Sequence, residues 1–227
     1  MIWQYQGYTV CLKYSRRFLK VRYFRDHSLV IATHNAGKFE EMAKLLENFS
    51  GLSLYSSKDF NLTEPKETGS TYVENARLKA KFSAKMTGLP CLSDDSGIEI
   101  DGLDGAPGVY TADWAETENG RNFDYAMETV WNKLEKKKTP FPRKARFCCT
   151  LILAWPDMHE EIFQGVAEGS LTWPGRGKNG HGFDPIFVPK DYSLTYGEMD
   201  RWTKNSISHR GMAFKKMINT CFTNYDK

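Results

Sequence analysis

The stretch Ser93-Asp94-Asp95-Ser96-Gly97 lies between a short apolar run, Leu89 to Leu92, and an alternating segment, Ile98 to Asp101. Both flanking segments have the composition of short β-strands, which places the two aspartates at a strand end. Neighbouring carboxylates repel each other there, and a divalent cation such as Mg²⁺ offsets that repulsion by binding their oxygens. Asp, Ser and Gly are also common in turns, so this stretch by itself predicts a turn as well as a metal site.

The composition defines the class of protein. The chain has 227 residues, 41% hydrophobic and 26% charged, which suits one large α/β domain or two small ones with a sizeable core. No apolar run approaches the roughly 18 residues of a membrane span, so we expect no membrane partner. The five cysteines are odd in number and lack the spacing of a zinc site. Three of them lie in apolar segments, which predicts free thiols and a cytoplasmic protein.

Positive charge is concentrated at the N-terminus. Residues 1–27 carry six lysines and arginines against one aspartate, a local charge of +5 within a net charge of +3, so the rest of the chain is slightly acidic. Such a segment fits a targeting sequence, a basic arm for nucleic acid or anionic membrane, or an extension without a role. It lacks the long apolar region of a secretory signal. We favour a loosely packed or disordered extension and expect no nucleic acid as partner.

The folded domain is predicted to cover residues 28–227. Its first segment, Leu29-Val30-Ile31-Ala32, is a continuous apolar run typical of a strand buried on both faces. The segment Thr33-His34-Asn35-Ala36-Gly37-Lys38 follows and opens an amphipathic helix. A helix N-terminus with a lysine offers unpaired N–H groups and positive charge to a phosphate. A Walker A loop is excluded, because its first glycine is missing and Phe39 stands in place of its Ser or Thr.

A capping box opens a second long helix. Thr71 and Glu74 are spaced for reciprocal capping, apolar residues continue along one side to Met86, and Gly88 ends the helix. Glu74 and Asn75 are unusual on this otherwise apolar stretch. They either cap the helix and face solvent or point toward the acidic strand end.

Two further segments carry functional residue types near the C-terminus. The segment from Gly175 to Pro185 is rich in glycine, which lets the backbone approach a ligand closely. A C-terminal helix is predicted after Ser208, with Lys204 before it and His209-Arg210 at its start. Positive side chains at a helix N-terminus oppose the helix dipole but favour anions, and such a local conflict is typical of a functional site.

Six motifs come in one order along this chain: Thr33-His34-Asn35-Ala36-Gly37-Lys38, Glu67-Thr68-Gly69 with Glu74-Asn75-Ala76, Ser93-Asp94-Asp95-Ser96-Gly97, Gly105-Ala106-Pro107-Gly108, Gly182-Phe183-Asp184-Pro185 and Ser208-His209-Arg210-Gly211. Together they resemble the motifs of the inosine triphosphate pyrophosphatase family. The resemblance covers Ser28 to about Ile218. It implies an α/β fold with an elongated mixed β-sheet flanked by helices, two lobes around a central substrate cleft, and a homodimer.

The resemblance also implies the reaction and its residues. The expected activity is Mg²⁺-dependent hydrolysis of non-canonical purine nucleoside triphosphates (ITP, dITP and XTP) to the monophosphate and pyrophosphate. In this reading Asp95 holds the metal and is the base for a metal-bound water that attacks the α-phosphorus, with Asp94 beside it. Positive charge from three distant segments would bind the triphosphate. The implied substrate-binding residues are Thr33, His34, Asn35, Ala36, Gly37, Lys38, Ser96, His181, Gly182, Phe183, Asp184, Lys204, His209 and Arg210.

The chain departs from the family pattern at three places. Members usually have two glutamates before Thr-Gly, the first counted as a metal ligand, and here that position is Lys66. We predict that Glu67 replaces it; the alternatives are that Glu64 does, or that neither does and Asp95 holds the metal with waters and substrate phosphates. His181 stands where the family often has an aromatic residue, and residues 1–27 have no counterpart. Two rival functions are a nucleotide- or nucleic-acid-binding module that has lost catalysis, and a phosphatase that releases orthophosphate.

Overall fold

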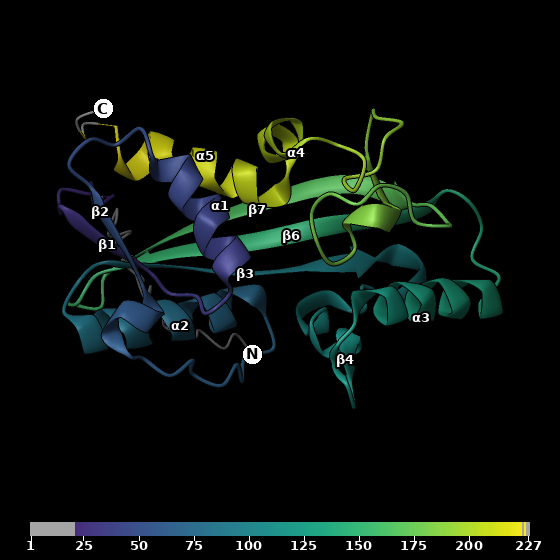
Figure 1. Cartoon of the computed structure of the whole chain (residues 1–227), viewed down its shortest axis with the longest axis horizontal. Helices are drawn as coiled ribbons and strands as arrows, with labels where there is room; N and C mark the ends of the chain where they lie inside the picture. The colour runs from purple at the N-terminus through teal and green to yellow at the C-terminus, as the bar shows by residue number, and fades with distance from the viewer. Residues whose placement is uncertain (1–20, 224, 226–227) are drawn as a thin grey trace, which may run out of the picture.

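A mixed β-sheet of six strands runs along the length of the molecule (Figure 1). The computed structural model describes residues 21–223 and residue 225. The strands of the sheet are β1 (Ser28–Ile31), β2 (Ser53–Ser56), β3 (Cys91–Ile100), β6 (Arg143–Ala154), β7 (Glu160–Leu171) and β8 (Phe187–Pro189). They follow the order β2-β1-β3-β6-β7-β8 across the sheet. β1 is parallel to its neighbours β2 and β3, and the other pairs are antiparallel.

Helices cover both faces of this sheet. They are α1 (Ala36–Leu46), α2 (Tyr72–Thr87), α3 (Phe123–Lys136), α4 (Arg201–Ile207) and α5 (His209–Cys221). Figure 1 shows α1 and α5 on one side of the long strands and α2 and α3 on the other. This confirms the predicted α/β class with an elongated mixed sheet flanked by helices. No helix in the described part of the chain is long and apolar enough to cross a membrane.

The course of β3 corrects the local prediction for the two aspartates. The strand does not end before Asp94 and restart at Ile98, because every residue of β3 pairs with β6 in antiparallel register. Gly97 lets the loop at Gly108 approach this strand closely, since a Cβ there would collide with the carbonyl oxygen of Gly108. The carboxylates of Asp94 and Asp95 therefore lie within a long central strand and not at its end.

Side chains along the central strands alternate between the two helix layers. Leu151 of β6 packs in the cluster of α1 and α5, whereas the next residue, Ile152, packs with the buried alanines of α2. Leu92 of β3 shares the cluster of α1 and α5. By the same period of two, Asp94 faces α1 and α5, and Asp95 faces α2.

Two large hydrophobic clusters lie toward opposite ends of the sheet. One packs β1, α1 and α5 together around side chains that include Leu29, Met42 and Phe214. The other packs α3 and β8 onto the sheet around Val130 and Phe187. These two centres of packing are the predicted lobes, and residues from both line the cavities described below.

The packed domain begins before Ser28. Phe24 is fully buried, its ring stacks on Phe222 with centroids 4.7 Å apart, and its backbone N–H donates to the carbonyl of Cys221 at 2.8 Å. Arg22 forms an ion pair with Asp157 at 2.7 Å. This end of the predicted extension thus belongs to the core, and the remainder of that prediction concerns residues 1–20, outside the described residues.

A short hairpin stands apart from the main sheet. It consists of β4 (Glu116–Thr117) and β5 (Gly120–Arg121), which pair antiparallel. The backbone N–H of Asn122 donates to the carbonyl of Ala115 at 2.6 Å. The side chain of Asn122 also caps α3 by accepting from the N–H of Tyr125. The base of the hairpin is therefore fixed to the start of α3.

Candidate active site

Asp94 lies in the layer of α1 and α5, enclosed by positive charge. Its carboxylate is 3.0 Å from Nζ of Lys38 and 3.1 Å from Nη2 of Arg210. It also accepts a hydrogen bond from the hydroxyl of Ser96 at 3.2 Å. Although burial opposes ionisation, Lys38 and Arg210 hold the pKa of Asp94 well below its ordinary value. Asp94 is therefore an ionised anchor for two cations.

Asp95 faces α2 and meets a different set of partners. Nδ2 of Asn75 donates to Asp95 Oδ2 at 3.3 Å, and Nζ of Lys79 lies 3.8 Å from Oδ1. Lys79 also contacts Oε1 of Glu67 at 2.5 Å. The prediction that Asn75 points toward the acidic strand is confirmed. Glu74 has the other role considered, because it accepts from the backbone and caps α2.

The environment of Asp95 shifts its proton equilibrium toward neutral pH. Burial is the main cause, and the negative charges of Glu67 and Asp94 add to it. These effects outweigh the opposing charge of Lys79 and raise the pKa of Asp95 to about 7. A carboxyl that exchanges its proton near pH 7 is suited to general-base chemistry.

The segment from Thr33 to Lys38 forms the start of α1, as the sequence predicts. Asn35 caps the helix by accepting from the backbone N–H of Lys38 at 3.0 Å. The ring of His34 contacts the carbonyl of Leu62 through Nε2 at 2.8 Å, which ties this loop to the segment after β2. The Lys38 side chain contacts Asp94, so a bound phosphate would have to share the Lys38 ammonium group with that carboxylate.

An aromatic cavity of about 450 Å³ lies between the lobes. Its walls include the rings of Phe123, Phe147, Phe183 and His209. Phe147 and His209 stack with centroids 4.8 Å apart and planes 11° apart. Phe123 and Phe183 meet edge to face at 6.2 Å. The rings of each pair pack directly on each other, and the aromatic wall that they form together suits contact with a flat heterocyclic ligand.

The segment His181 to Asp184 approaches the aromatic cavity from the loop before β8. Asp184 is buried, accepts from the backbone N–H of His181 at 2.7 Å and pairs with Nζ of Lys204 at 2.6 Å. Burial lowers the pKa of His181 below its ordinary value. Gly182 has a positive φ of 68°, which favours glycine at this turn. Asp184 and Lys204 thus satisfy each other at the wall of the cavity.

His209 and Arg210 open α5, as predicted, with the Ser208 hydroxyl accepting from the N–H of Gly211 at 3.0 Å. Burial and the charge of Arg210 hold the pKa of His209 well below its ordinary value, so its ring is neutral at pH 7. Nδ1 of His209 and Nε of Arg210 are buried, and neither has a hydrogen-bond partner among the described residues. Arg210 uses its other nitrogens on Asp94 and on Glu41 at 2.9 Å. A buried nitrogen without a hydrogen-bond partner costs free energy. A polar ligand in the adjoining cavity would recover that cost by forming the missing hydrogen bond.

A second cavity of about 690 Å³, the carboxylate cavity, is lined by Asp95, Glu67 and Lys79. Thr33, His34, Glu64 and Lys66 line it as well. Five residues line both cavities, namely Asn35, Lys38, Ser96, Ala112 and Arg121. The two cavities are therefore adjoining parts of the predicted central cleft, and Ala36 is the one implied residue that lines neither.

Comparisons with known proteins agree with this architecture. A model of the Ham1 family matches residues 29–220. The chain is 59% identical to the dITP/XTP pyrophosphatase of Ruegeria pomeroyi, over 88% of this chain and 98% of that protein. The chain belongs to the Ham1 family. It is also 49% identical to the dITP/XTP pyrophosphatase of Agrobacterium fabrum, over 88% of this chain and 99% of that one.

A solved Ham1 structure has the same fold. The HAM1 protein from Coxiella burnetii superimposes with a TM-score of 0.78 at 38% identity, covering 85% of this chain and 96% of that one. The resemblance inferred from the six motifs is thereby confirmed.

Sequence reasoning missed several residues of this Ham1 site. Lys79 reads as a solvated lysine of an amphipathic helix, but it stands four residues after Asn75 and therefore shares its face of α2. That spacing was an available signal. Phe123, Phe147 and Arg121 reach the cleft from separate elements, and no local pattern marks them.

The carboxylate cavity fits a hard divalent cation. Asp95 and Glu67 line it together, and the repulsion of their charges contributes, after burial, to the raised pKa of Asp95. No group of three or more His, Cys, Asp or Glu side chains within the described residues forms a complete metal cage. Mg²⁺ commonly uses one or two carboxylates and completes its coordination with waters and phosphates. Asp95, Glu67 and the alternative Glu64 all line this cavity, and Glu67 is the one of the two glutamates whose charge acts on Asp95.

Proposed function

We propose that this Ham1 protein hydrolyses non-canonical purine nucleoside triphosphates, dITP, ITP and XTP, to the monophosphate and pyrophosphate. The observation that carries the proposal is the junction of an aromatic cavity with a cavity that contains a carboxyl of pKa about 7. A purine fits the first cavity and a phosphate chain the second. The names of the relatives, dITP/XTP pyrophosphatases, support the same substrates.

Asp95 is the proposed general base. Its ionised form accepts a proton from a water while the water oxygen forms a bond to the α-phosphorus. The bond from that phosphorus to the bridging oxygen breaks, and pyrophosphate leaves with the electron pair. Asn75 and Lys79 hold the Asp95 carboxylate in place through contacts at 3.3 and 3.8 Å.

Asp95 and Glu67 would hold Mg²⁺ in the carboxylate cavity. When bound, the cation supplies positive charge against the charge that grows on the phosphate oxygens. Lys38 lines both cavities and lies beside the expected path of the phosphate chain. Its ion pair with Asp94 keeps the ammonium fixed before the substrate arrives, which reduces the cost of ordering it.

Purine selection is proposed to rest on His209. Its neutral ring is held by Phe147, and its Nδ1 is buried without a partner. A ring N–H that donates to a 6-oxo group would find no acceptor on the 6-amino group of adenine. Such a mismatch leaves buried polar groups unpaired, so it discriminates strongly.

The test is a product assay with separate detection of pyrophosphate and orthophosphate. We expect dITP, ITP and XTP with Mg²⁺ to yield pyrophosphate and the monophosphate, and dATP to react far more slowly. Orthophosphate with a diphosphate product would instead identify a phosphatase. Binding of dITP without turnover would identify a module that has lost catalysis. Conversion of dATP at an equal rate would remove His209 from purine selection.

Three further predictions remain part of the proposal. We expect a homodimer, to be measured by light scattering, and action in the cytoplasm, where the nucleotide pool is. We also expect no nucleic-acid partner, because residues 28–227 carry a slight negative charge. Retention of the purified protein on single-stranded RNA at physiological salt would contradict the last expectation.

A further inference from the structure

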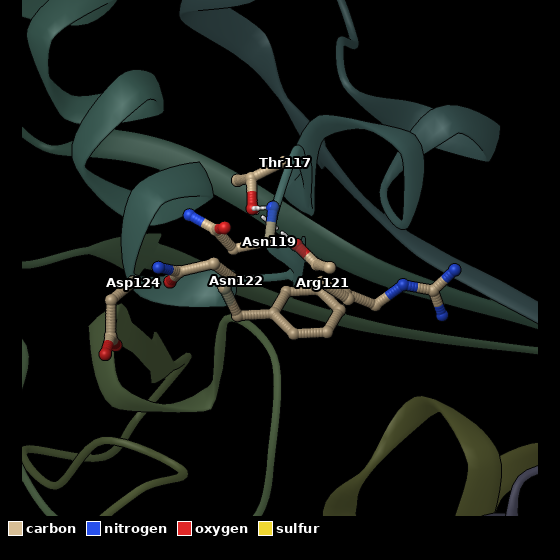
Figure 2. A pocket seen from close by; sticks show the side chains of 7 residues that line it. Thr117, Asn119, Arg121, Asn122 and Asp124 are labelled. Carbon is tan, nitrogen blue, oxygen red and sulfur yellow. Dashed lines mark hydrogen bonds between the residues drawn. The ribbon is translucent and has the colours of Figure 1, made fainter.

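The β4–β5 hairpin presents one arginine at the cleft. Arg121 is the last residue of β5 and lies directly opposite Glu116 in the hairpin register. Arg121 lines the pocket of about 410 Å³ at the hairpin, and in Figure 2 its side chain extends away from those of Asn119, Asn122 and Asp124, which line it too. The guanidinium is therefore not part of the packing that holds the hairpin to α3.

Arg121 stands where the two cavities meet. It lines the aromatic cavity with Phe123 and Phe183, and it lines the carboxylate cavity with Asp95 and Lys79. A nucleotide with its base in the first cavity and its phosphates in the second would cross this junction at the α-phosphate. Of the five residues common to both cavities, Arg121 and Lys38 carry positive charge.

Apart from Lys66, which lines the carboxylate cavity, the other lysines and arginines of the two cavities are already paired with carboxylates. Lys38 and Arg210 neutralise Asp94, which has 1% of its side chain exposed, and Lys204 pairs with Asp184, which has 3% exposed. Lys79 contacts Glu67. These pairs offset each other, so they leave little net positive charge for a triphosphate.

The pair of Arg121 and Glu116 differs in its exposure. Nε and Nη2 of Arg121 both donate to Oε1 of Glu116, at 2.8 and 2.5 Å, and about half of each side chain is exposed (51% and 49%). An exposed ion pair contributes little to stability and exchanges partners readily. Arginine also matches the geometry of phosphate oxygens with two parallel hydrogen bonds.

We propose that the Arg121 side chain leaves Glu116 when the nucleotide binds and donates hydrogen bonds to the α-phosphate. Before binding, the ion pair with Glu116 keeps the guanidinium beside the cleft. This inference rests on the proposed function for the identity of the ligand. The backbone at Arg121 stays in place, because Asn122 is bonded to Ala115 and caps α3. The change is a side-chain rotation and needs no movement of the hairpin.

Steady-state kinetics with dITP and Mg²⁺ tests the proposal through variants with opposite expected signs. Arg121→Ala should lower kcat/KM about 10- to 100-fold, the range for losing a hydrogen bond to a charged group. Arg121→Lys should recover part of the loss, since lysine keeps the charge without the fork geometry. Glu116→Gln should lower KM up to about fivefold, because it removes the competing carboxylate.

Two measurements separate a phosphate contact from other roles. The loss in Arg121→Ala should be equal for dITP and XTP, and the inhibition constant of dIMP should rise about 10-fold or more. Arg146→Ala is the matched control, because Arg146 forms a similar partly exposed pair with Glu99 and lines neither cavity. We expect its kcat/KM to match the wild type.

Three results would overturn the inference. Unchanged kcat/KM in Arg121→Ala removes the contact, and a loss in Glu116→Gln equal to that in Arg121→Ala means that the pair only holds the hairpin. A dIMP inhibition constant that stays constant in Arg121→Ala excludes the α-phosphate. By contrast, a wild type that releases no pyrophosphate from dITP would overturn the proposed function itself.

Discussion

The two faces of β3 shift the pKa of chemically identical side chains in opposite directions. On the face of α1 and α5, Asp94 is surrounded by Lys38 and Arg210, and its pKa falls well below the ordinary value. On the face of α2, Asp95 is buried near other carboxylates, and its pKa rises to about 7. The period of two along a strand separates these environments although the residues are consecutive.

The two faces of β3 therefore have different roles. The Asp94 face holds permanent charges together and stabilises the position of α1 and α5. The Asp95 face keeps a carboxyl that is costly to ionise and therefore available for proton transfer. A strand through the middle of a cleft can in this way supply a structural and a chemical carboxylate from one dipeptide.

The largest expected effect comes from Asp95→Asn. We expect kcat for dITP to fall at least about 10²-fold, the scale for losing a general base, without loss of the fold. Pyrophosphate release measures the activity, and circular dichroism measures the fold. Near-normal turnover in this variant would show that Asp95 is not the general base and that the two faces of β3 do not differ in their chemical role.

The same variant has an expected stability signature. A folded-state pKa raised from the ordinary value of about 4 means that the Asp95 contribution favours folding below pH 4 and is lost as pH rises through about 7. Asp95→Asn should therefore melt above the wild type at pH 8, and the difference should shrink toward pH 5. Equal melting temperatures at both pH values would argue against the raised pKa.

Asp94→Asn should act mainly on stability. It leaves the buried charge of Arg210 and the partly exposed charge of Lys38 short of a partner, and breaking a buried pair costs about 3–5 kcal/mol. Urea denaturation at pH 7 measures the change. Glu99→Gln is a control that breaks a partly exposed pair and should cost no more than about 1 kcal/mol. An Asp94→Asn protein as stable as the wild type but inactive would assign Asp94 to the chemistry.

Glu67→Gln should weaken the response to Mg²⁺. Removing one of two candidate carboxylate ligands is expected to raise the Mg²⁺ concentration for half-maximal activity on the order of 10-fold or more. Lys66→Gln is the neighbouring control and should leave the Mg²⁺ titration unchanged, because an ammonium cannot ligate a cation. A shift in Lys66→Gln but not in Glu67→Gln would exclude Glu67 as the ligand.

The pH dependence of the wild type tests the same contrast without any substitution. A general base works in its ionised form, so kcat/KM should rise about 10-fold per pH unit below pH 7 and level off above it. The residual kcat/KM of Asp95→Asn should not rise with pH in this range. A wild-type profile that is flat from pH 5 to pH 8 would place the pKa of Asp95 in its ordinary range and remove the contrast with Asp94.

Local signals predicted much of the fold and many of the site residues. The strand before Thr33, the capping box at Thr71 and the start of α5 at His209 depend on neighbouring residues, and the structure confirms them. Their physical causes, apolar periodicity and capping, act over a few residues. The order of six such motifs was enough to indicate the family.

Features set by distant partners were not predictable. The continuity of β3 through Asp95 depends on pairing with Thr150 of β6, and the sequence around the aspartates resembles a turn. The packing of Phe24 depends on Phe222, at the other end of the chain. The pairing of Lys38 with Asp94 likewise follows from how α1 packs on the sheet. Such contacts form only when the sheet and the helices pack together, so no local sequence pattern indicates them.

The stacking of Phe24 on Phe222 also bears on how the chain folds during its synthesis. The hydrophobic cluster around Leu29 and Met42 is completed by Ala213, Phe214 and other residues of α5 and its C-terminal flank. A nascent chain still attached to the ribosome therefore exposes the apolar side of its first strand and helix until α5 emerges. In this protein β1 and α1 can complete the lobe that they share with α5 only after α5 has been synthesised.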